Sequence, residues 1–179
     1  VRSRRQRQMC IRDRLLETSD NQEVRWLAIT NLVAAGQLPA SAADEEHDDS
    51  SEGAISRLRV RAVADKAWAW KKLVEEDLTN LEARYLMDGL TFTDAGLDGL
   101  ADDYFRIAPG LWDRLTNEMA QRTLEGMYPG WAVDQASVEK ADALLNDPQV
   151  PSGLKRVVAE GQDRTARKLR NRTVDAEAN

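Results

Sequence analysis

The sequence predicts an all-α protein whose helices pack as an array of antiparallel hairpins. Apolar residues recur at helical spacing over most of the 179 residues, and no Asn-Gly or Asp-Gly turn separates two alternating apolar runs, as it would in a β-hairpin. The segments between the expected helices are short, which is typical of antiparallel neighbours. These observations favour an irregular superhelix of the HEAT or armadillo kind, and a closed bundle fits the same pattern.

The clearest expected helix runs from Leu111 to Met127. Its apolar stripe is Leu111, Leu115, Met119, Leu124 and Met127. Pro109-Gly110 is expected to mark its start, and Pro129-Gly130 its end. Two charge pairs at i,i+4, Arg114 with Glu118 and Glu118 with Arg122, are each expected to add about 0.2–0.5 kcal/mol.

In the first half of the chain, capping residues and glycines indicate where several helices begin and end. Asp20, with Glu23 three residues on, predicts the start of a helix over 21–35. Val24 and Leu27 are expected on the inner face of this helix. Gly36 is expected to be the residue that follows its last turn. A short exposed acidic helix within 41–49 and a break at 50–53 are expected to follow. Further helices are expected from Ile55 to Val63 and from Asp65 to Val74. Another helix is expected to begin at Thr79, which forms a capping signature with Glu82. The inward-facing residues of that helix are expected to be Leu81, Tyr85 and Leu86.

In the second half, three more helices are expected around the one at 111–127. They run from Thr93 or Asp94 to Phe105, from Asp134 or Ser137 to Leu145, and from Pro151 to about Thr173. Residues 175–179 are expected to form a disordered tail. Together, residues 15–174 are expected to make up one helical domain.

The first fourteen residues differ in composition from the rest. They hold six arginines and one aspartate, so that residues 15–179 carry a formal charge of −11 against −6 for the whole chain, and they contain the single cysteine, Cys10. The string resembles translated sequencing-adapter read-through, so we expect residues 1–14 to be a non-native leader. A disordered basic tail, or an arm that binds nucleic acid or membrane, are the alternatives. The acidic remainder argues against nucleic acid, and no apolar run is long enough to span a membrane.

Catalytic motifs are absent from the sequence. It contains no HExxH, G-x-S-x-G, G-x-G-x-x-G or G-x-x-x-x-G-K-[ST]. The only histidine, His47, lies among Glu45, Glu46, Asp48 and Asp49, an arrangement that is more typical of a solvated acidic face than of a metal site. Carboxylate pairs such as Glu75-Glu76 and Asp102-Asp103 are common in so acidic a chain, so we expect them to lie on solvated helix faces. We therefore expect no catalytic, cofactor-binding or metal-binding residue in this chain.

Two groups of residues have both a structural and a binding interpretation. Trp112 and Trp131 fit packing between helices better than stacking on a ligand. The last expected helix is rich in cations: Lys155, Arg156, Arg164, Arg167, Lys168, Arg170 and Arg172. Cations near a helix C-terminus compensate its dipole, and in an acidic domain they could also recognise a carboxylate.

Several blocks of sequence resemble the C-terminal end of actinobacterial aminopeptidase N. They are EVRWLAITNLVAAG, KAWAWKKLVEED, DDYFRIAPGLW, LWDRLTNEMAQRTLEGMYPGW and PSGLKRVVAEGQDRTARKLRNR, which follow one another in order between about Asp20 and about Arg172. The blocks are structural and do not include the family's HExxH or G-x-M-E-N motifs.

The resemblance implies a zinc-dependent enzyme that removes N-terminal residues from peptides. The acidic, helical composition of this chain is compatible with the cytosol, so we expect a cytoplasmic location. In that family the zinc and the catalytic residues lie in a separate domain, and a C-terminal helical-repeat domain covers the peptide chamber. This chain is therefore expected to be that cap domain, truncated at its N-terminus and inactive alone. Its expected partners are the catalytic domain of the same polypeptide and a peptide substrate, with zinc in the parent enzyme only. The alternative is a free-standing helical-repeat adaptor that binds a protein or peptide.

Overall fold

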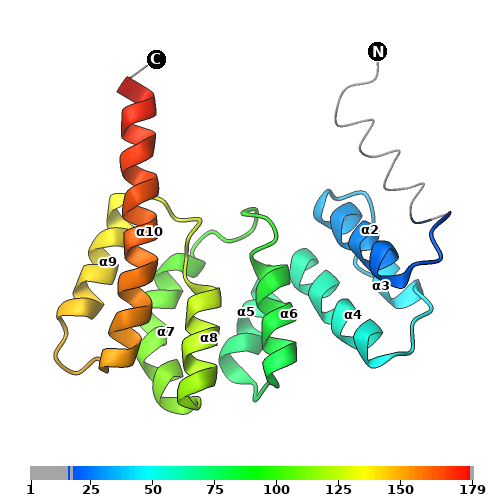
Figure 1. Ribbon diagram of the computed structural model, residues 1–179, viewed down its shortest axis with the longest axis horizontal. Coiled ribbons are helices and arrows are strands. Elements are labelled where there is room, and N and C mark those ends of the chain that lie inside the picture. The colour runs from blue at the N-terminus through cyan, green and yellow to red at the C-terminus, as the bar shows by residue number, and fades with distance from the viewer. Residues whose placement is uncertain (1–15, 17, 178–179) are drawn as a thin grey trace. The chain divides into compact units, whose positions relative to one another are not determined.

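A computed structural model describes residue 16 and residues 18–177 of the chain, with side chains as far as Arg172. Every regular element in this part of the chain is a helix and none is a strand, which confirms the all-α class (Figure 1). The helices are α2 (Gln22–Ala34), α3 (Ala42–Glu45), α4 (Ser51–Ala64), α5 (Lys66–Glu75), α6 (Asn80–Leu90), α7 (Leu100–Arg114), α8 (Asn117–Met127), α9 (Gln135–Asn146) and α10 (Ser152–Glu177). The leader expected at 1–14 lies outside the described residues.

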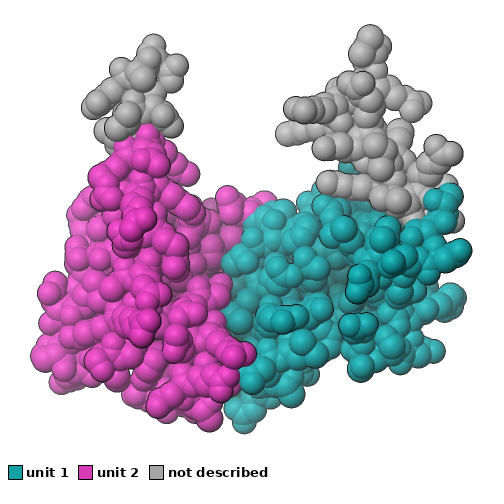
Figure 2. Space-filling view, viewed as in Figure 1, with its two compact units in different colours: residues 1–93 teal, residues 94–179 magenta. Residues whose placement is uncertain are grey.

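The chain divides into two compact units, Val1–Thr93 and Asp94–Asn179 (Figure 2). In the first unit, α4 is the central helix, since it packs against α2, α3, α5 and α6. In the second unit, α10 packs against α7, α8 and α9. Each unit buries its own apolar side chains, including Ile29, Leu86 and Leu90 in the first, and Tyr104, Leu124 and Leu154 in the second.

Most helix ends follow the local signals in the sequence. Thr79 and Glu82 form the predicted reciprocal capping box at the start of α6. The side chains of Asp65 and Asp134 accept hydrogen bonds from the first turns of α5 and α9. Gly36 has φ 68° and closes α2 with the two backbone hydrogen bonds of a Schellman motif, Gly36 N to Val33 O and Gln37 N to Leu32 O.

Two predictions about the first unit's helix starts are wrong. The cap of α2 is Asn21, whose side chain accepts from Val24 N at 3.2 Å, and not Asp20. Gly53 does not break the chain but lies buried inside α4, after the cap Ser50. A Cβ at Gly53 would collide with the backbone and side chain of Asp48, so glycine is required here by a neighbouring segment and not by a turn.

The expected helix over 111–127 is in fact two helices. Residues 111–114 are the last turn of α7, and Leu115 and Thr116 are extended, with ψ of 159° and 151°, before α8 begins at Asn117. Arg114 and Glu118 consequently lie in different helices, whereas Glu118 and Arg122 form the expected pair at 2.9 Å. The single stripe expected from the sequence therefore belongs to two helices.

Pro109 lies inside α7 and does not mark the start of a helix. Proline cannot donate the helical hydrogen bond and normally disfavours a helix interior by about 3 kcal/mol. Here Tyr104, Ala108 and Leu111, at i, i+4 and i+7, are all buried on one side, and this burial favours a helix that continues through the proline. At the other end, α7 begins at Leu100 and not at Thr93 or Asp94, because Gly96 and Gly99, with φ of 80° and 79°, occupy the preceding turns.

Three smaller differences concern exposure and length. Leu27 and Leu81, expected to face inward, are 53 % and 47 % exposed. The last helix, α10, continues beyond Thr173 to Glu177, because no glycine or proline follows Gly161. The tail expected at 175–179 therefore falls partly within α10 and partly outside the described residues.

Candidate functional site

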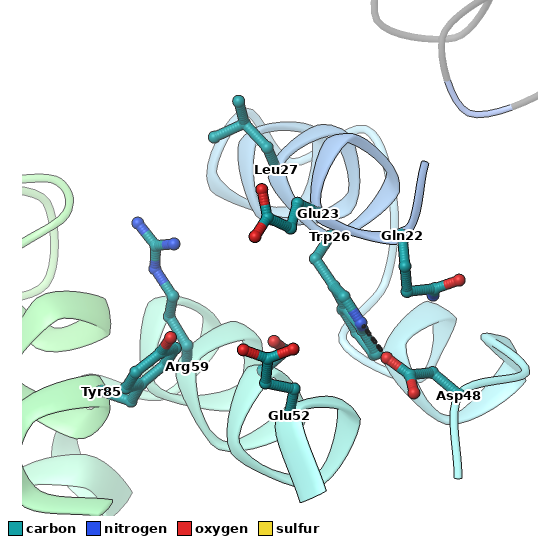
Figure 3. A pocket seen from close by; sticks show the side chains of 9 residues that line it. Gln22, Glu23, Trp26, Leu27, Asp48, Glu52, Arg59 and Tyr85 are labelled. Atoms are coloured by element: carbon teal, nitrogen blue, oxygen red, sulfur yellow. Dashed lines mark hydrogen bonds between the residues drawn. The ribbon is translucent and has the colours of Figure 1, made fainter. Parts of the chain in front are cut away.

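One candidate site among the described residues is a cleft of about 320 Å³ in the first unit, which we call the α2–α4 cleft. Figure 3 shows its walls, formed by α2 on one side and α4 on the other, with Tyr85 contributed by α6. The lining residues are Gln22, Glu23, Trp26, Leu27, Asp48, Glu52, Ser56, Arg59 and Tyr85.

One wall of the cleft is fixed by a hydrogen bond between Trp26 and Asp48. The indole Nε1 donates to Asp48 Oδ2 at 2.7 Å, and the backbone N–H and hydroxyl of Ser50 both donate to Asp48 Oδ1, at 3.1 and 2.5 Å. The hydrogen bond from the Ser50 hydroxyl is the largest cause that lowers the pKa of Asp48, and the hydrogen bond from the Trp26 indole is the second. The carboxylate of Asp48 is thereby engaged with its own surroundings.

Arg57 supports this wall from behind. Its guanidinium donates to three backbone carbonyls, those of Ala43 at 3.2 Å, Glu46 at 2.8 Å and Asp48 at 2.9 Å. It also lies 5.6 Å from the centre of the Trp26 ring. These contacts fix the segment that connects α3 to α4 and occupy one face of the indole.

The opposite side of the cleft carries Arg59 and Tyr85. The Arg59 Nε lies 2.8 Å from Asp88 Oδ2, and its guanidinium lies 5.4 Å from the centre of the Phe92 ring. Asp88 therefore compensates the charge of Arg59 in part, although the buried Nε has no hydrogen bond of good geometry. Two carboxylates, those of Glu23 on α2 and Glu52 on α4, lie between the two sides (Figure 3).

The acidic segment around His47 does not fit a metal site. Glu46 is only 8 % exposed, and it binds Arg25 through two bonds and Gln22 through a third. The hydrogen bond from Arg25 is the main cause that lowers the pKa of Glu46. With Asp48 also engaged, no group of three histidine, cysteine or acidic side chains converges anywhere in the described ranges. The residues that the structure describes therefore do not fit a zinc ion.

The paired carboxylates named from the sequence form ordinary ion pairs. Glu75 and Glu76 pair with Lys71 and Lys72, one helical turn earlier. Asp103 pairs with Arg106 on the same helix, and Asp102 pairs with Lys140 of α9. None of these arrangements holds two carboxylates toward one substrate-sized space.

The two tryptophans singled out in the second unit have different surroundings. Trp112 packs against α10 at Gly153, where an added Cβ would lie 2.5 Å from the ring. Trp131 lines a second cleft of about 350 Å³, whose rim carries the Lys140–Asp102 ion pair. Trp112 is therefore a packing residue, and Trp131 is half-buried and open to this cleft.

The cations of α10 contact mainly the chain itself. Lys168 Nζ donates to Gly130 O at 2.8 Å, and Arg172 donates to Val133 O at 3.3 Å. Arg167 and Arg156 pair with acidic residues one turn earlier or later on α10, Asp163 and Glu160. Lys168 and Arg172 thus hold the segment between α8 and α9 against α10.

Sequence reasoning missed the residues of the α2–α4 cleft. The sequence pattern indicates Glu23 only as a capping residue and Tyr85 only as an inward-facing residue of its helix, and it does not indicate Glu52 or Arg59. These residues come together only because α2 and α6 both pack on α4, and no spacing along the chain indicates that. Across the described residues, no helix has the length and apolar content of a membrane span.

The sequence is similar to part of a known protein. Over 165 residues, 87 % of this chain, the sequence is 32 % identical to aminopeptidase N of Streptomyces lividans. The chain spans 19 % of the length of that relative. No family model matches the sequence. The similarity fits one domain of an aminopeptidase N, and the all-helical fold agrees with the helical domain expected from the sequence blocks.

Proposed function

We propose that this chain is the C-terminal helical domain of a zinc-dependent aminopeptidase N and covers the peptide chamber of that enzyme. The observation that carries the proposal is the similarity to the Streptomyces lividans enzyme, which extends over nearly all of this chain but only a fifth of the relative. In this proposal the zinc, the catalytic residues and the parent enzyme's peptide-hydrolysing activity belong to a catalytic domain of the same polypeptide. That domain is the main partner of this chain, and the parent enzyme is cytoplasmic.

The contacts between helices support an array of repeats. Helices that follow one another in the chain pack together, as in α5 with α6, α7 with α8, and α9 with α10. Such near-neighbour packing is typical of helical-repeat arrays, in which each repeat contacts mainly the next. We therefore propose an irregular HEAT-like arrangement of hairpins, whose faces limit access to the chamber.

A graft tests this proposal. The segment of the Streptomyces lividans enzyme that aligns with this chain is replaced by the chain, and kcat/KM is measured on an aminoacyl-arylamide and on longer peptides. The graft is expected to fold and hydrolyse both, whereas the enzyme without the segment loses its discrimination by peptide length. A matched graft that carries Leu86→Asp and Leu154→Asp, at two fully buried positions, is expected to behave like the enzyme without the segment.

The isolated chain provides the second arm of the test. It is expected to show no zinc-dependent turnover of the arylamide, and measurable turnover would overturn the assignment of the catalytic centre to another domain. A free-standing adaptor is the second candidate, favoured by the exposed Leu27 at the α2–α4 cleft. An inactive but folded graft, together with a defined peptide ligand for the isolated chain, would favour the adaptor.

A further inference from the structure

We propose that the α2–α4 cleft binds the basic side chain of a peptide, an arginine or a lysine, through the carboxylates of Glu23 and Glu52. This inference goes beyond the proposed function, because it holds whether or not the chain belongs to an aminopeptidase. It rests on the arrangement of charge around one cleft.

The two carboxylates project from different helices toward one space. Glu23 extends from α2 and Glu52 from α4, between Trp26 on one side and Arg59 with Tyr85 on the other (Figure 3). Within the described part of the chain neither carboxylate has a hydrogen-bond or ion-pair partner. Two like charges that share a cleft repel each other, and a cation placed between them removes that repulsion.

The other charged groups of the cleft already have partners of their own. Asp48 accepts hydrogen bonds from Trp26 and Ser50, and Arg59 is held by Asp88 at 2.8 Å. The uncompensated charge of the lining is therefore negative. A cationic ligand matches this charge, whereas an anionic ligand would compete with Asp88 for Arg59 and would lie beside Glu23 and Glu52.

The size and the apolar surface of the cleft fit one long side chain. A volume of about 320 Å³ lies at the lower end of the range of roughly 300–1,000 Å³ for ligand sites. Leu27, which is 53 % exposed, and the half-buried Tyr85 provide apolar contacts for the methylene groups of a lysine or arginine. A planar guanidinium can in addition donate to two carboxylates at once, so arginine is the better match.

The experiment uses the 179-residue chain and two probes of the same shape. N-acetyl-arginine amide carries the charge, and N-acetyl-citrulline amide is its uncharged counterpart. Binding is followed by NMR through the indole N–H signal of Trp26, which Trp26→Phe identifies. The arginine probe is expected to shift this signal in a saturable way, and the citrulline probe is expected to leave it in place.

Variants separate the two carboxylates from the general acidity of the chain. Glu23→Gln and Glu52→Gln are each expected to weaken the arginine probe about twofold to fivefold, the range for an exposed ion pair. Glu75→Gln, on α5 and outside the cleft, is the matched control and is expected to change nothing. Thermal unfolding of each variant verifies that the fold is retained, as expected for exposed positions.

Three outcomes would overturn the proposal. The first is equal binding of the arginine and citrulline probes. The second is unchanged binding of the arginine probe by both Gln variants. The third is binding of N-acetyl-glutamate amide that disappears in Arg59→Met, which would make the cleft an anion site.

Discussion

Arg25 and Glu46 form a two-bond ion pair that joins α2 to the segment after α3. Arg25 Nε donates to Oε1 at 2.7 Å and a terminal nitrogen donates to Oε2 at 2.8 Å, while Gln22 donates to the same carboxylate at 2.8 Å. The Glu46 side chain is only 7 % exposed, so the pair is more shielded from water than the pairs Arg59–Asp88, Lys72–Glu76 and Arg122–Glu118, in each of which both side chains are at least 20 % exposed. The pair stabilises the wall on which Asp48 and Trp26 are placed.

Replacing Glu46 by glutamine is expected to lower the free energy of unfolding by about 1–3 kcal/mol, because charged hydrogen bonds to a shielded carboxylate are lost. Urea denaturation measures the change. Glu118→Gln is the matched control, since Glu118 pairs with Arg122 while 66 % exposed, and its expected effect is below about 0.5 kcal/mol. Equal effects of the two substitutions would show that the shielding of Glu46 contributes nothing.

Glu46 also predicts a dependence of stability on pH. Its pKa in the folded chain is lowered from 4.5, mainly by Arg25, so the unfolded chain binds the proton more readily than the folded chain. The contribution of Glu46 is therefore present above pH 4.5 and is lost as the pH falls through and below that value. Urea denaturation between pH 7 and pH 3 measures how the free energy of unfolding changes with pH. Glu46→Gln is expected to make this free energy depend less steeply on pH. A slope that is unchanged in the variant would contradict the assignment.

Gly89 predicts a steric effect at the contact between α4 and α6. An added Cβ would lie 2.5 Å from Arg59 O and 2.7 Å from Ala62 Cβ, and a backbone oxygen cannot move aside cheaply. Gly89→Ala is thus expected to destabilise the chain by about 1–3 kcal/mol. Gly110→Ala in α7 is the control, because nothing lies within 4 Å of its added Cβ, and it is expected to stabilise by about 0.5–1 kcal/mol. Thermal and urea unfolding measure both, and a neutral Gly89→Ala would show that the two helices separate readily.

Features that depend on three or four neighbouring residues could be predicted from the sequence. The capping box of Thr79 with Glu82 and the αL residue Gly36 are of this kind, because the donor and the acceptor lie within one turn. The all-α class follows from periodicity in the same way. Features that depend on packing could not be predicted, as the break at Leu115 shows, because the apolar stripes on either side happen to join at helical spacing.

The candidate site belongs to the second kind. Glu23 and Glu52 lie 29 positions apart in the sequence, and only the packing of α2 on α4 brings them to one cleft. The glycines show the same limit: Gly53 and Gly89 look like helix breakers, yet both lie inside helices where another segment approaches closely. In both cases the cause is a residue that is distant in sequence.

Lys66 is the clearest packing feature that the sequence did not indicate. It is 7 % exposed, and its ammonium donates to the carbonyl oxygens of Gly89 at 2.8 Å and Leu90 at 2.7 Å, at the C-terminal end of α6. Gly89 O also accepts from the backbone N–H of Phe92 at 3.3 Å, and the positive charge of Lys66 compensates the helix dipole. The N-terminal residue of α5 thus closes the end of α6.

Lys66→Met is expected to lower the free energy of unfolding by about 1–3 kcal/mol, because the methionine keeps the apolar stem but removes the charged donor to Leu90 O and Gly89 O, of which Gly89 O keeps its backbone bond from Phe92 N. Lys71→Met is the matched control on the same helix, since Lys71 is 70 % exposed and lies 3.8 Å from Glu75. Its expected effect is within about 0.5 kcal/mol. Amide hydrogen exchange adds a local readout, in which the last turn of α6 exchanges faster in Lys66→Met than in the control. If Lys66→Met were as stable as the parent chain, the burial of the ammonium would be as unfavourable as its two hydrogen bonds are favourable, and α6 would end without needing this donor.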